Sequence, residues 1–103
     1  HVNSAVAVEP KGIETHYYHD YSKELARVVQ NHLIKDIDTK DRGLLKSKFY
    51  VINHTTVPAI LIETGFISNE EERNELVTDS RKQKTAKAIA EGIIEYIKSQ
   101  QKK

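Results

Sequence analysis

The 103-residue chain contains no Cys, no Met and no Trp, and it has only two Pro and four Gly. The absence of Cys excludes a disulfide framework, a thiolate zinc site and a cysteine nucleophile, so any metal must be held by His, Asp or Glu. No apolar run approaches the ~20 residues that a membrane-spanning helix requires. Because Met is absent, residue 1 is not a natural translation start, and we expect a processed or excised piece.

The charges are almost balanced, with 16 Lys and Arg against 15 Asp and Glu and a formal net charge of +1. This balance argues against a dedicated nucleic-acid binder, because such domains carry a basic excess on one face. Apolar residues make up 38% of the chain and charged residues 30%. The Ile, Leu and Val residues cluster in periodic runs, which predicts a folded chain of one small domain or part of a larger one.

The first half of the chain alternates between strand and helix patterns. Residues 12–18 are β-branched and aromatic and predict a strand, and residues 23–35 show helical spacing after Ser22. The polar stretch 36–48 is expected to be a connection. Residues 49–52 predict a short strand, and the run 59–62 after Pro58 predicts a strand that is covered on both faces.

The second half is expected to be helical. Asn69 with Glu72 resembles a capping box and predicts a short helix to about residue 77, and Ser80 with Gln83 predicts the start of a long last helix. The expected inward face of that helix consists of Ala86, Ile89, Ala90, Ile93, Ile94 and Ile97. The alternation predicts an α/β fold with a mostly parallel sheet flanked by helices, about three strands and three helices. So few strands suggest missing sequence on the N-terminal side.

Glu63 is the most informative single residue, because it directly follows the apolar run 60–62. In open α/β sheets, ligands bind outside the carboxyl ends of the strands. Thr64 and Gly65 allow a tight turn there, so the carboxylate can face a cleft. A carboxylate partly removed from water has a raised pKa and suits general acid–base work. Alternatively, Glu63 caps the next segment or pairs with a cation such as Arg42.

The five histidines are the natural candidates for metal ligands in a chain without Cys. His16 and His19 are three residues apart and would point to opposite faces of a strand, so neither is expected to be a ligand. We place His16 on the same strand face as Glu14. His32 lies on the apolar stripe of the first helix and is expected to be partly buried, and His54 is expected in a loop near the cleft.

The basic residues near the start of the last helix are expected to form a solvated face: Arg81, Lys82, Lys84 and Lys87. Attraction of an anionic cell-wall polymer is the less favoured alternative. The chain has no Gly-rich phosphate loop and no Gly-x-Ser-x-Gly elbow.

Four stretches in order carry a resemblance to a known family: His1-Val2-Asn3-Ser4-Ala5, Gly12-Ile13-Glu14-Thr15, Asp41-Arg42-Gly43, and Pro58-Ala59-Ile60-Leu61-Ile62-Glu63-Thr64-Gly65-Phe66-Ile67-Ser68-Asn69. Together they resemble the zinc-dependent N-acetylmuramoyl-L-alanine amidases, the bacterial cell-wall amidase or autolysin family Amidase_3. The last stretch is highly specific, and the others support it by their order and spacing. The resemblance implies that residues 1–103 are the C-terminal portion of a single amidase catalytic domain.

The resemblance also implies a function. Members of the family have an α/β fold and hydrolyse the amide bond between N-acetylmuramic acid and L-alanine in peptidoglycan, outside the cell or in the cell wall. A Zn²⁺ ion is held by two His and one Glu. His1 matches the last zinc-binding His, and Glu63 matches the catalytic Glu, which would take a proton from the attacking water and pass it to the leaving amine.

The chain departs from the family in one respect. The family's first zinc-binding His and its zinc-binding Glu have no match and belong upstream of His1. We therefore expect the 103 residues alone to be inactive and to expose a sheet edge, which favours self-association or pairing with the missing half. The alternative function is a peptidoglycan-binding module that has the same fold but does not cut. A third possibility is a cytosolic α/β fragment in which Glu63 is structural.

Overall fold

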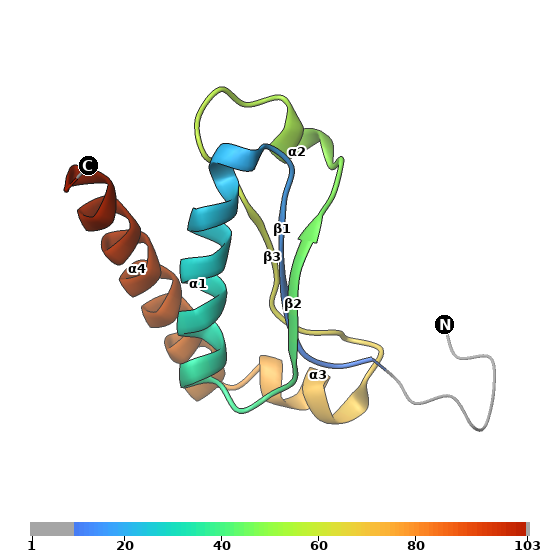
Figure 1. Ribbon diagram of the computed structural model, residues 1–103. Coiled ribbons are helices and arrows are strands. Elements are labelled where there is room, and N and C mark those ends of the chain that lie inside the picture. Colours follow the sequence, from blue (N-terminus) through green and yellow to red (C-terminus); the bar gives the residue numbers. More distant parts are fainter. Residues whose placement is uncertain (1–9, 103) are drawn as a thin grey trace.

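A computed structural model describes residues 10–102 of the chain, and Figure 1 shows the arrangement of its helices and strands. In order along the chain, the elements are β1 (Ile13–Tyr17), the 3₁₀ helix η1 (Asp20–Ser22), α1 (Lys23–Asp36), β2 (Asp41–Lys46), α2 (Tyr50–Asn53), β3 (Leu61–Glu63), α3 (Glu70–Leu76) and α4 (Asp79–Gln101). The expected α/β fold is confirmed. The three expected helices correspond to α1, α3 and α4, and α2 is an additional single turn.

The three strands form one sheet in the order β2-β1-β3, with β1 in the centre. β1 pairs with β2 in parallel and with β3 in antiparallel orientation, so the described sheet is mixed, with one parallel and one antiparallel pair. Glu14 lies directly opposite Glu63 across the antiparallel pair. This register places both carboxylates on the same face of the sheet, because cross-strand partners point to the same side.

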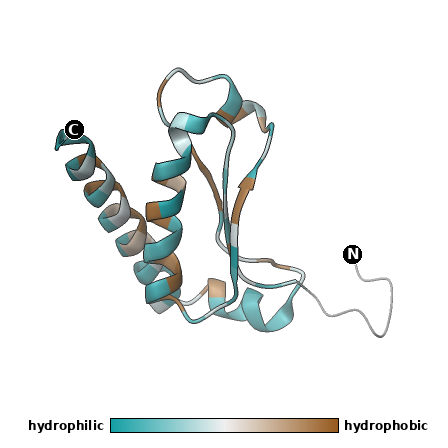
Figure 2. Ribbon diagram, viewed as in Figure 1, coloured by the Kyte–Doolittle hydropathy of each residue, from teal (hydrophilic) through white to brown (hydrophobic). Residues whose placement is uncertain are grey.

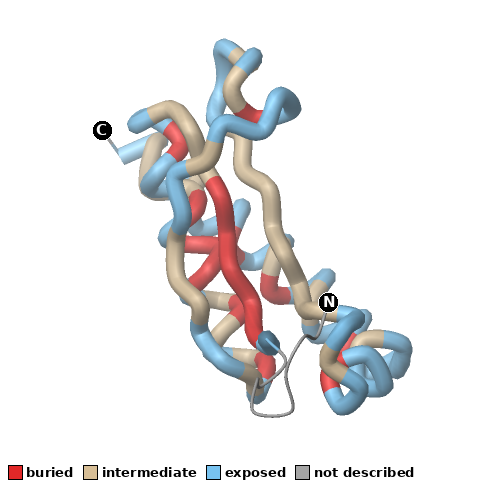
Figure 3. The backbone as a smooth tube through the Cα atoms, turned by 90° about the vertical axis from the view of Figure 1, so that its right-hand side faces the viewer, coloured by how far each residue is buried: buried red, intermediate tan, exposed pale blue. Residues whose placement is uncertain are grey.

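The helices α1 and α4 lie on one side of the sheet, with α4 beside α1 (Figure 1). The buried core lies between α1, α4 and β1 and consists of Ile13, Val29, Leu33, Ile37 and Ala88. Thr15 also points to this side, and its hydroxyl donates to Gln30 Oε1 of α1 over 2.7 Å. Figure 3 shows that buried backbone follows β1 and part of α1.

The opposite face of the sheet carries the polar residues of β1. Because side chains alternate along a strand, Glu14 and His16 point away from α1 while Ile13 and Thr15 point towards it. Leu61 and Glu63 of β3 share the face of Glu14 and His16 through the register of the sheet. All three residues of β3 are only partly buried, so within residues 10–102 this strand is not fully covered on both faces as expected.

Two segments differ from the sequence-based expectation. The stretch expected to be a polar connection contains β2, because the edges of β1 offer hydrogen bonds that a local pattern does not reveal. A register irregularity between Ile13 and Glu14 and a positive φ of 78° at Gly43 accompany this pairing. The expected strand at 49–52 is instead the helical turn α2, which buries Ile52 and leaves Tyr50 and Val51 exposed.

The last two helices begin with capping side chains. The side chain of Asn69 accepts the backbone N–H of Glu72 over 2.9 Å at the start of α3, which confirms half of the expected capping box. The start of α4 lies two residues before the expected position, because Thr78 accepts the N–H of Arg81 over 3.1 Å. Ser22 precedes α1 as expected, but its hydroxyl accepts the N–H of Ala59 instead of capping the helix.

The expected inward face of α4 is largely wrong. The buried residues of this helix are Arg81, Ala88 and Gly92, whereas Ile94 and Ile97 are exposed. Gly92 permits the close approach of α1, since a Cβ placed there would lie 3.0 Å from Val29 Cα. Hydrophobic residues therefore occur around α4 and not only on the side that faces α1 (Figure 2). Among residues 10–102, no helix is long and apolar enough to cross a membrane.

Candidate functional site

Glu63 lies at the carboxyl end of β3 and borders an open hollow of about 520 Å³ on the helix-free face of the sheet. Glu14 and His16 of β1 form part of the wall, and Phe49 and Phe66 add two aromatic rings. The expectation that Glu63 faces a cleft thus has a structural counterpart. Within residues 10–102, Glu63 forms no ion pair, and Asn69 rather than Glu63 caps the following helix.

Glu14 is the most strongly bound carboxylate of the hollow. Arg42 Nε donates to its Oε1 over 2.9 Å, and His16 Nε2 lies 2.7 Å from its Oε2. Burial alone would raise the pKa of Glu14, but the hydrogen bonds and charges of Arg42 and His16 outweigh it and hold the pKa below its ordinary value. The depressed pKa favours the ionised form of Glu14, and Arg42 pairs with Glu14 rather than with Glu63.

His16 is held from three sides. Its Nδ1 lies 2.6 Å from the hydroxyl of Ser47, its Nε2 binds Glu14, and its ring meets the edge of Phe49 at a centroid distance of 5.2 Å. The Arg42 guanidinium carbon lies 4.9 Å from the centre of the Phe66 ring. A continuous network thus runs from Ser47 through His16, Glu14 and Arg42 to the ring of Phe66.

The prediction that His16 and Glu14 share one strand face is confirmed; it followed from their spacing of two residues. No functional role was predicted for either residue. Their partners Arg42 and Ser47 are far away in the sequence, on β2 and just after it, in the stretch that was expected to be a connection. The network therefore became visible only with the pairing of β1 and β2.

The other described histidines lie elsewhere. His19 Nε2 lies 2.9 Å from the carbonyl oxygen of Asn53, and His32 is half-buried with its Nε2 2.8 Å from Glu95. These positions agree with the structural roles that were expected. His54 follows α2 outside any helix or strand, as expected; it is exposed, stacks on Tyr50 at 3.9 Å and does not line the hollow of Glu63.

The basic group at the start of α4 is also split. Lys82, Lys84 and Lys87 are exposed as expected, but Arg81 is buried with 3% of its side chain accessible. Its guanidinium donates to the carbonyl oxygen of Thr64, next to Glu63. Burial of Arg81 could not be read from a cluster of four cations, because its partners come from two other segments.

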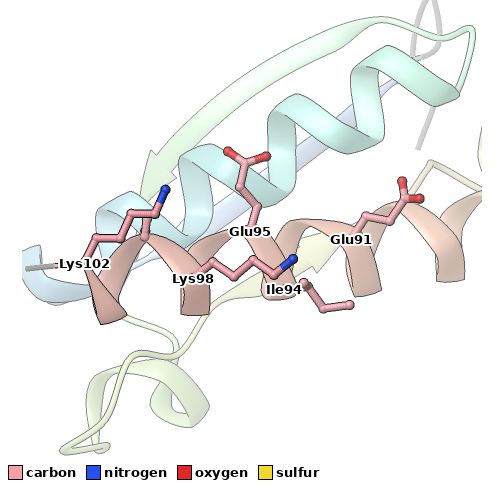
Figure 4. Close-up of a pocket in the computed structure, with 6 residues that line it drawn as sticks. Glu91, Ile94, Glu95, Lys98 and Lys102 are labelled. Atoms are coloured by element: carbon pink, nitrogen blue, oxygen red, sulfur yellow. The ribbon is translucent and has the colours of Figure 1, made fainter.

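A second hollow of about 460 Å³ lies along the C-terminal half of α4 and is distinct from the first (Figure 4). It is lined by residues of α4, among them Ile94, Glu95 and Lys98, and by the C-cap residue Lys102. Figure 4 shows these side chains spread along the helix surface rather than converging on a point. The hollow shares no lining residue with that of Glu63, and it offers no catalytic arrangement.

The described residues do not fit a complete zinc site. No group of three or more His, Cys, Asp or Glu side chains in residues 10–102 is placed to hold a metal ion. Glu14 and His16 already bind each other, and Arg42 and Ser47 take further polar atoms of the pair. His1, the expected zinc ligand, lies outside the described residues.

Comparisons with known proteins agree with one another. The Amidase_3 family, described as N-acetylmuramoyl-L-alanine amidase, matches residues 1–95. The amidase LytC of Bacillus subtilis strain 168 is 37% identical over 100 residues, which are 93% of this chain and 20% of LytC. The uncharacterised protein YqiI of the same organism is 41% identical over 93% of this chain and 48% of its own length.

Solved structures show the same relationship. The catalytic domain of the amidase CwlV from Bacillus (Paenibacillus) polymyxa var. colistinus matches with a TM-score of 0.85 and 36% identity, over 95% of this chain and 55% of that chain. An amidase from Clostridium difficile 630 matches with a TM-score of 0.86 and 32% identity, over 93% and 53% of the two chains. The chain thus spans about half the length of these solved structures.

Proposed function

Because the chain belongs to the N-acetylmuramoyl-L-alanine amidase family Amidase_3, we propose that it forms part of an enzyme that hydrolyses the amide bond between N-acetylmuramic acid and L-alanine in peptidoglycan. The observation that supports this most directly is the position of Glu63, at the carboxyl end of β3 and at the border of an open hollow. The proposed place of action is the cell wall, outside the cell.

Glu63 is the proposed general acid and base. Its carboxylate takes a proton from the attacking water and then passes it to the nitrogen of the leaving amine, so that one residue serves both halves of the reaction. Glu14 cannot readily replace it, because Arg42 and His16 occupy both of its oxygens. Two neighbouring carboxylates on one sheet face thereby have different roles: Glu63 is the proposed proton carrier, and Glu14 is bound at both oxygens.

We include Zn²⁺ in the proposal on the ground of family membership and the ligand that the resemblance assigns to His1. A bound zinc ion lowers the pKa of its water to about 7 and polarises the scissile carbonyl. Since residues 10–102 hold no complete site, the remaining ligands are expected upstream of His1. The 103 residues alone are then inactive and bind zinc weakly.

A zinc titration by calorimetry tests this part of the proposal, with His1→Ala as the control. Weak binding by the 103-residue chain agrees with an incomplete ligand set. Tight, stoichiometric binding that disappears in His1→Ala shows that other groups complete the site and contradicts the expected inactivity. Hydrolysis of the amide bond of a muramoyl-peptide by the 103 residues alone would also contradict it.

The role of Glu63 is tested in the complete amidase domain that contains this chain. Glu63→Gln keeps the size of the side chain but removes its ability to accept a proton, and we expect a loss of about 10²- to 10⁴-fold in kcat. Glu75→Gln is the matched control, because Glu75 is an exposed glutamate on α3 that does not line the hollow. New amino termini released from purified peptidoglycan measure the reaction. Wild-type kcat in Glu63→Gln contradicts the proposal.

A peptidoglycan-binding module without catalysis is the second candidate. The observation in its favour is the lack of a complete metal site in residues 10–102, together with the aromatic rings of Phe49 and Phe66 at the hollow. Sedimentation with insoluble peptidoglycan distinguishes the two. Binding without cleavage by the complete domain supports the module, and cleavage that depends on Glu63 supports the enzyme.

Self-association belongs to the same proposal. β2 and β3 each have one side without a strand partner in the described sheet, and Ile93, Ile94 and Ile97 of α4 are 40–51% exposed. Unpaired edges and apolar patches favour association. Light scattering of the 103-residue chain as a function of concentration measures it, and a monomer at all concentrations contradicts it.

A further inference from the structure

A buried carboxylate and a buried guanidinium lie behind the loop that follows Glu63. Glu72 of α3 is 4% exposed and Arg81 of α4 is 3% exposed, and Arg81 Nη2 lies 3.6 Å from Glu72 Oε1. In the sequence, Glu72 belongs to a capping-box pattern and Arg81 to a basic group that is expected to be solvated. Neither residue lines the hollow of Glu63.

Glu72 binds three segments that are distant in the sequence. Its carboxylate accepts the N–H of Gly12, at 3.1 and 2.9 Å from the two oxygens, the hydroxyl of Thr39 over 2.9 Å, and the N–H of Phe66 over 2.9 Å. These contacts join the start of β1, the approach to β2 and the loop after β3. One side chain therefore fixes the segments that carry Glu14, Arg42 and Glu63 relative to one another.

Arg81 binds the same loop at a second point. Its Nη2 donates to the carbonyl oxygen of Thr64 over 2.9 Å, directly after Glu63. Between the two anchored residues, Gly65 lies so close to α3 that a Cβ there would be 2.8 Å from Leu76 Cδ1. Both peptide groups that flank Gly65 are thus fixed, and the backbone of Glu63 has little freedom at its carboxyl side.

A buried ion pair of this kind contributes little to the free energy of unfolding. Replacing a buried ion pair by apolar residues is often neutral or stabilising, because desolvation of the charges cancels their attraction. In addition, Arg81 Nε is buried without a hydrogen-bond partner among the described residues. What the structure shows is that both members of the pair also bind the loop after Glu63, Glu72 through the N–H of Phe66 and Arg81 through the carbonyl oxygen of Thr64.

We propose that Glu72 and Arg81 are positioning residues for Glu63, holding the loop 64–66 so that the Glu63 carboxylate stays at the hollow. The inference rests on the proposed catalytic role of Glu63. Glu72→Gln presents amide hydrogens where only donors converge, so at least one N–H or O–H of Gly12, Thr39 and Phe66 loses its acceptor. The loop then shifts, and a displacement of about 1 Å can cost about 10²-fold in rate.

The test uses the complete amidase domain and four variants. We expect Glu72→Gln and Arg81→Lys to lower kcat by about 10- to 100-fold while KM changes little, because the loop positions the acid–base group rather than the substrate. Glu75→Gln is the matched control on α3. Leu33→Ala, in the core and away from the hollow, controls for lost stability, and its kcat should remain that of the wild type when the protein is folded.

A second measurement is made on the 103-residue chain itself. Amide hydrogen exchange of Phe66 should accelerate in Glu72→Gln and remain unchanged in Glu75→Gln. Wild-type kcat in folded Glu72→Gln or Arg81→Lys overturns the inference, and so does unchanged Phe66 exchange. If one variant fails to fold, the other decides.

Failure of the inference can be separated from failure of the proposed function. If Glu63→Gln abolishes turnover while Glu72→Gln and Arg81→Lys retain it, the positioning role alone is wrong. If Glu63→Gln retains turnover, the catalytic role of Glu63 is wrong and the positioning role falls with it.

Discussion

Gly12 is the position where a single methyl group should do the most damage to the site. Its φ of 118° lies in a region that L side chains rarely adopt. A Cβ there would be 2.4 Å from the carbonyl oxygen of Lys40 and 2.9 Å from Arg42 Cγ. The Lys40 carbonyl also accepts the N–H of Ile13 over 2.9 Å, so a shift that relieves the clash breaks this bond.

The magnitude follows from these three effects. Backbone strain at such a φ costs about 1–3 kcal/mol. Leaving a buried N–H or C=O without its partner costs about 1–3 kcal/mol. Ala has less conformational freedom than Gly in the unfolded chain, which offsets about 0.4–1 kcal/mol of this destabilisation. We therefore expect Gly12→Ala to lower the free energy of unfolding by about 3 kcal/mol, the middle of a range of about 1–5 kcal/mol.

Gly43 provides a control from within the same chain. Its φ is also positive, at 78°, but a Cβ there meets nothing within 4 Å. Gly43→Ala should therefore introduce backbone strain without a clash. After subtraction of the gain from the less flexible unfolded chain, we expect the free energy of unfolding to fall by about 1 kcal/mol. Urea unfolding of the two variants and the wild type, followed by circular dichroism, measures both values. Equal destabilisation by the two substitutions would refute the steric argument.

Two further predictions concern the network and the core. Because the pKa of Glu14 is lower in the folded protein, its stabilisation is present above the unfolded pKa and is lost as the pH falls through the folded value, so the free energy of unfolding should decrease on acidification below the ordinary value of 4.5. Glu14→Gln should show a shallower decrease, and parallel curves would contradict the pairing with Arg42 and His16. Leu33→Ala removes a fully buried side chain and should destabilise by about 2–5 kcal/mol, visible as a lower midpoint in the same urea titration. An unchanged midpoint would show that Leu33 is not in the core.

The elements that local pattern determines were predicted well. α1 follows from the helical spacing of Leu25, Val28 and Val29, and β1 follows from its β-branched and aromatic residues. The apolar run before Glu63 correctly predicted β3. In these segments the residues that decide the structure are neighbours in the sequence, so their periodicity is sufficient.

The errors occur where a segment depends on a distant partner. β2 contains Asp41, Arg42 and Gly43 and has no strand pattern, and its conformation comes from pairing with β1. The packing face of α4 was misjudged because close approach to Val29 selects Gly92 and Ala88 over the larger isoleucines. Local propensity is a weak guide in both cases, since tertiary contacts override it.

The sequence by itself determined the α/β class, the family membership through the stretch 58–69, and the position of Glu63 at the end of a strand. Only the tertiary structure decided that Glu14 lies opposite Glu63 with Arg42 and His16 bound to it, and that Glu72 and Arg81 anchor the loop behind. Motif order and strand position are local properties of the chain. The hydrogen bonds of Arg42 to Glu14 and of Gly12 to Glu72 join residues that are 28 and 60 positions apart in the sequence. They form only when packing of the strands and helices brings these residues together.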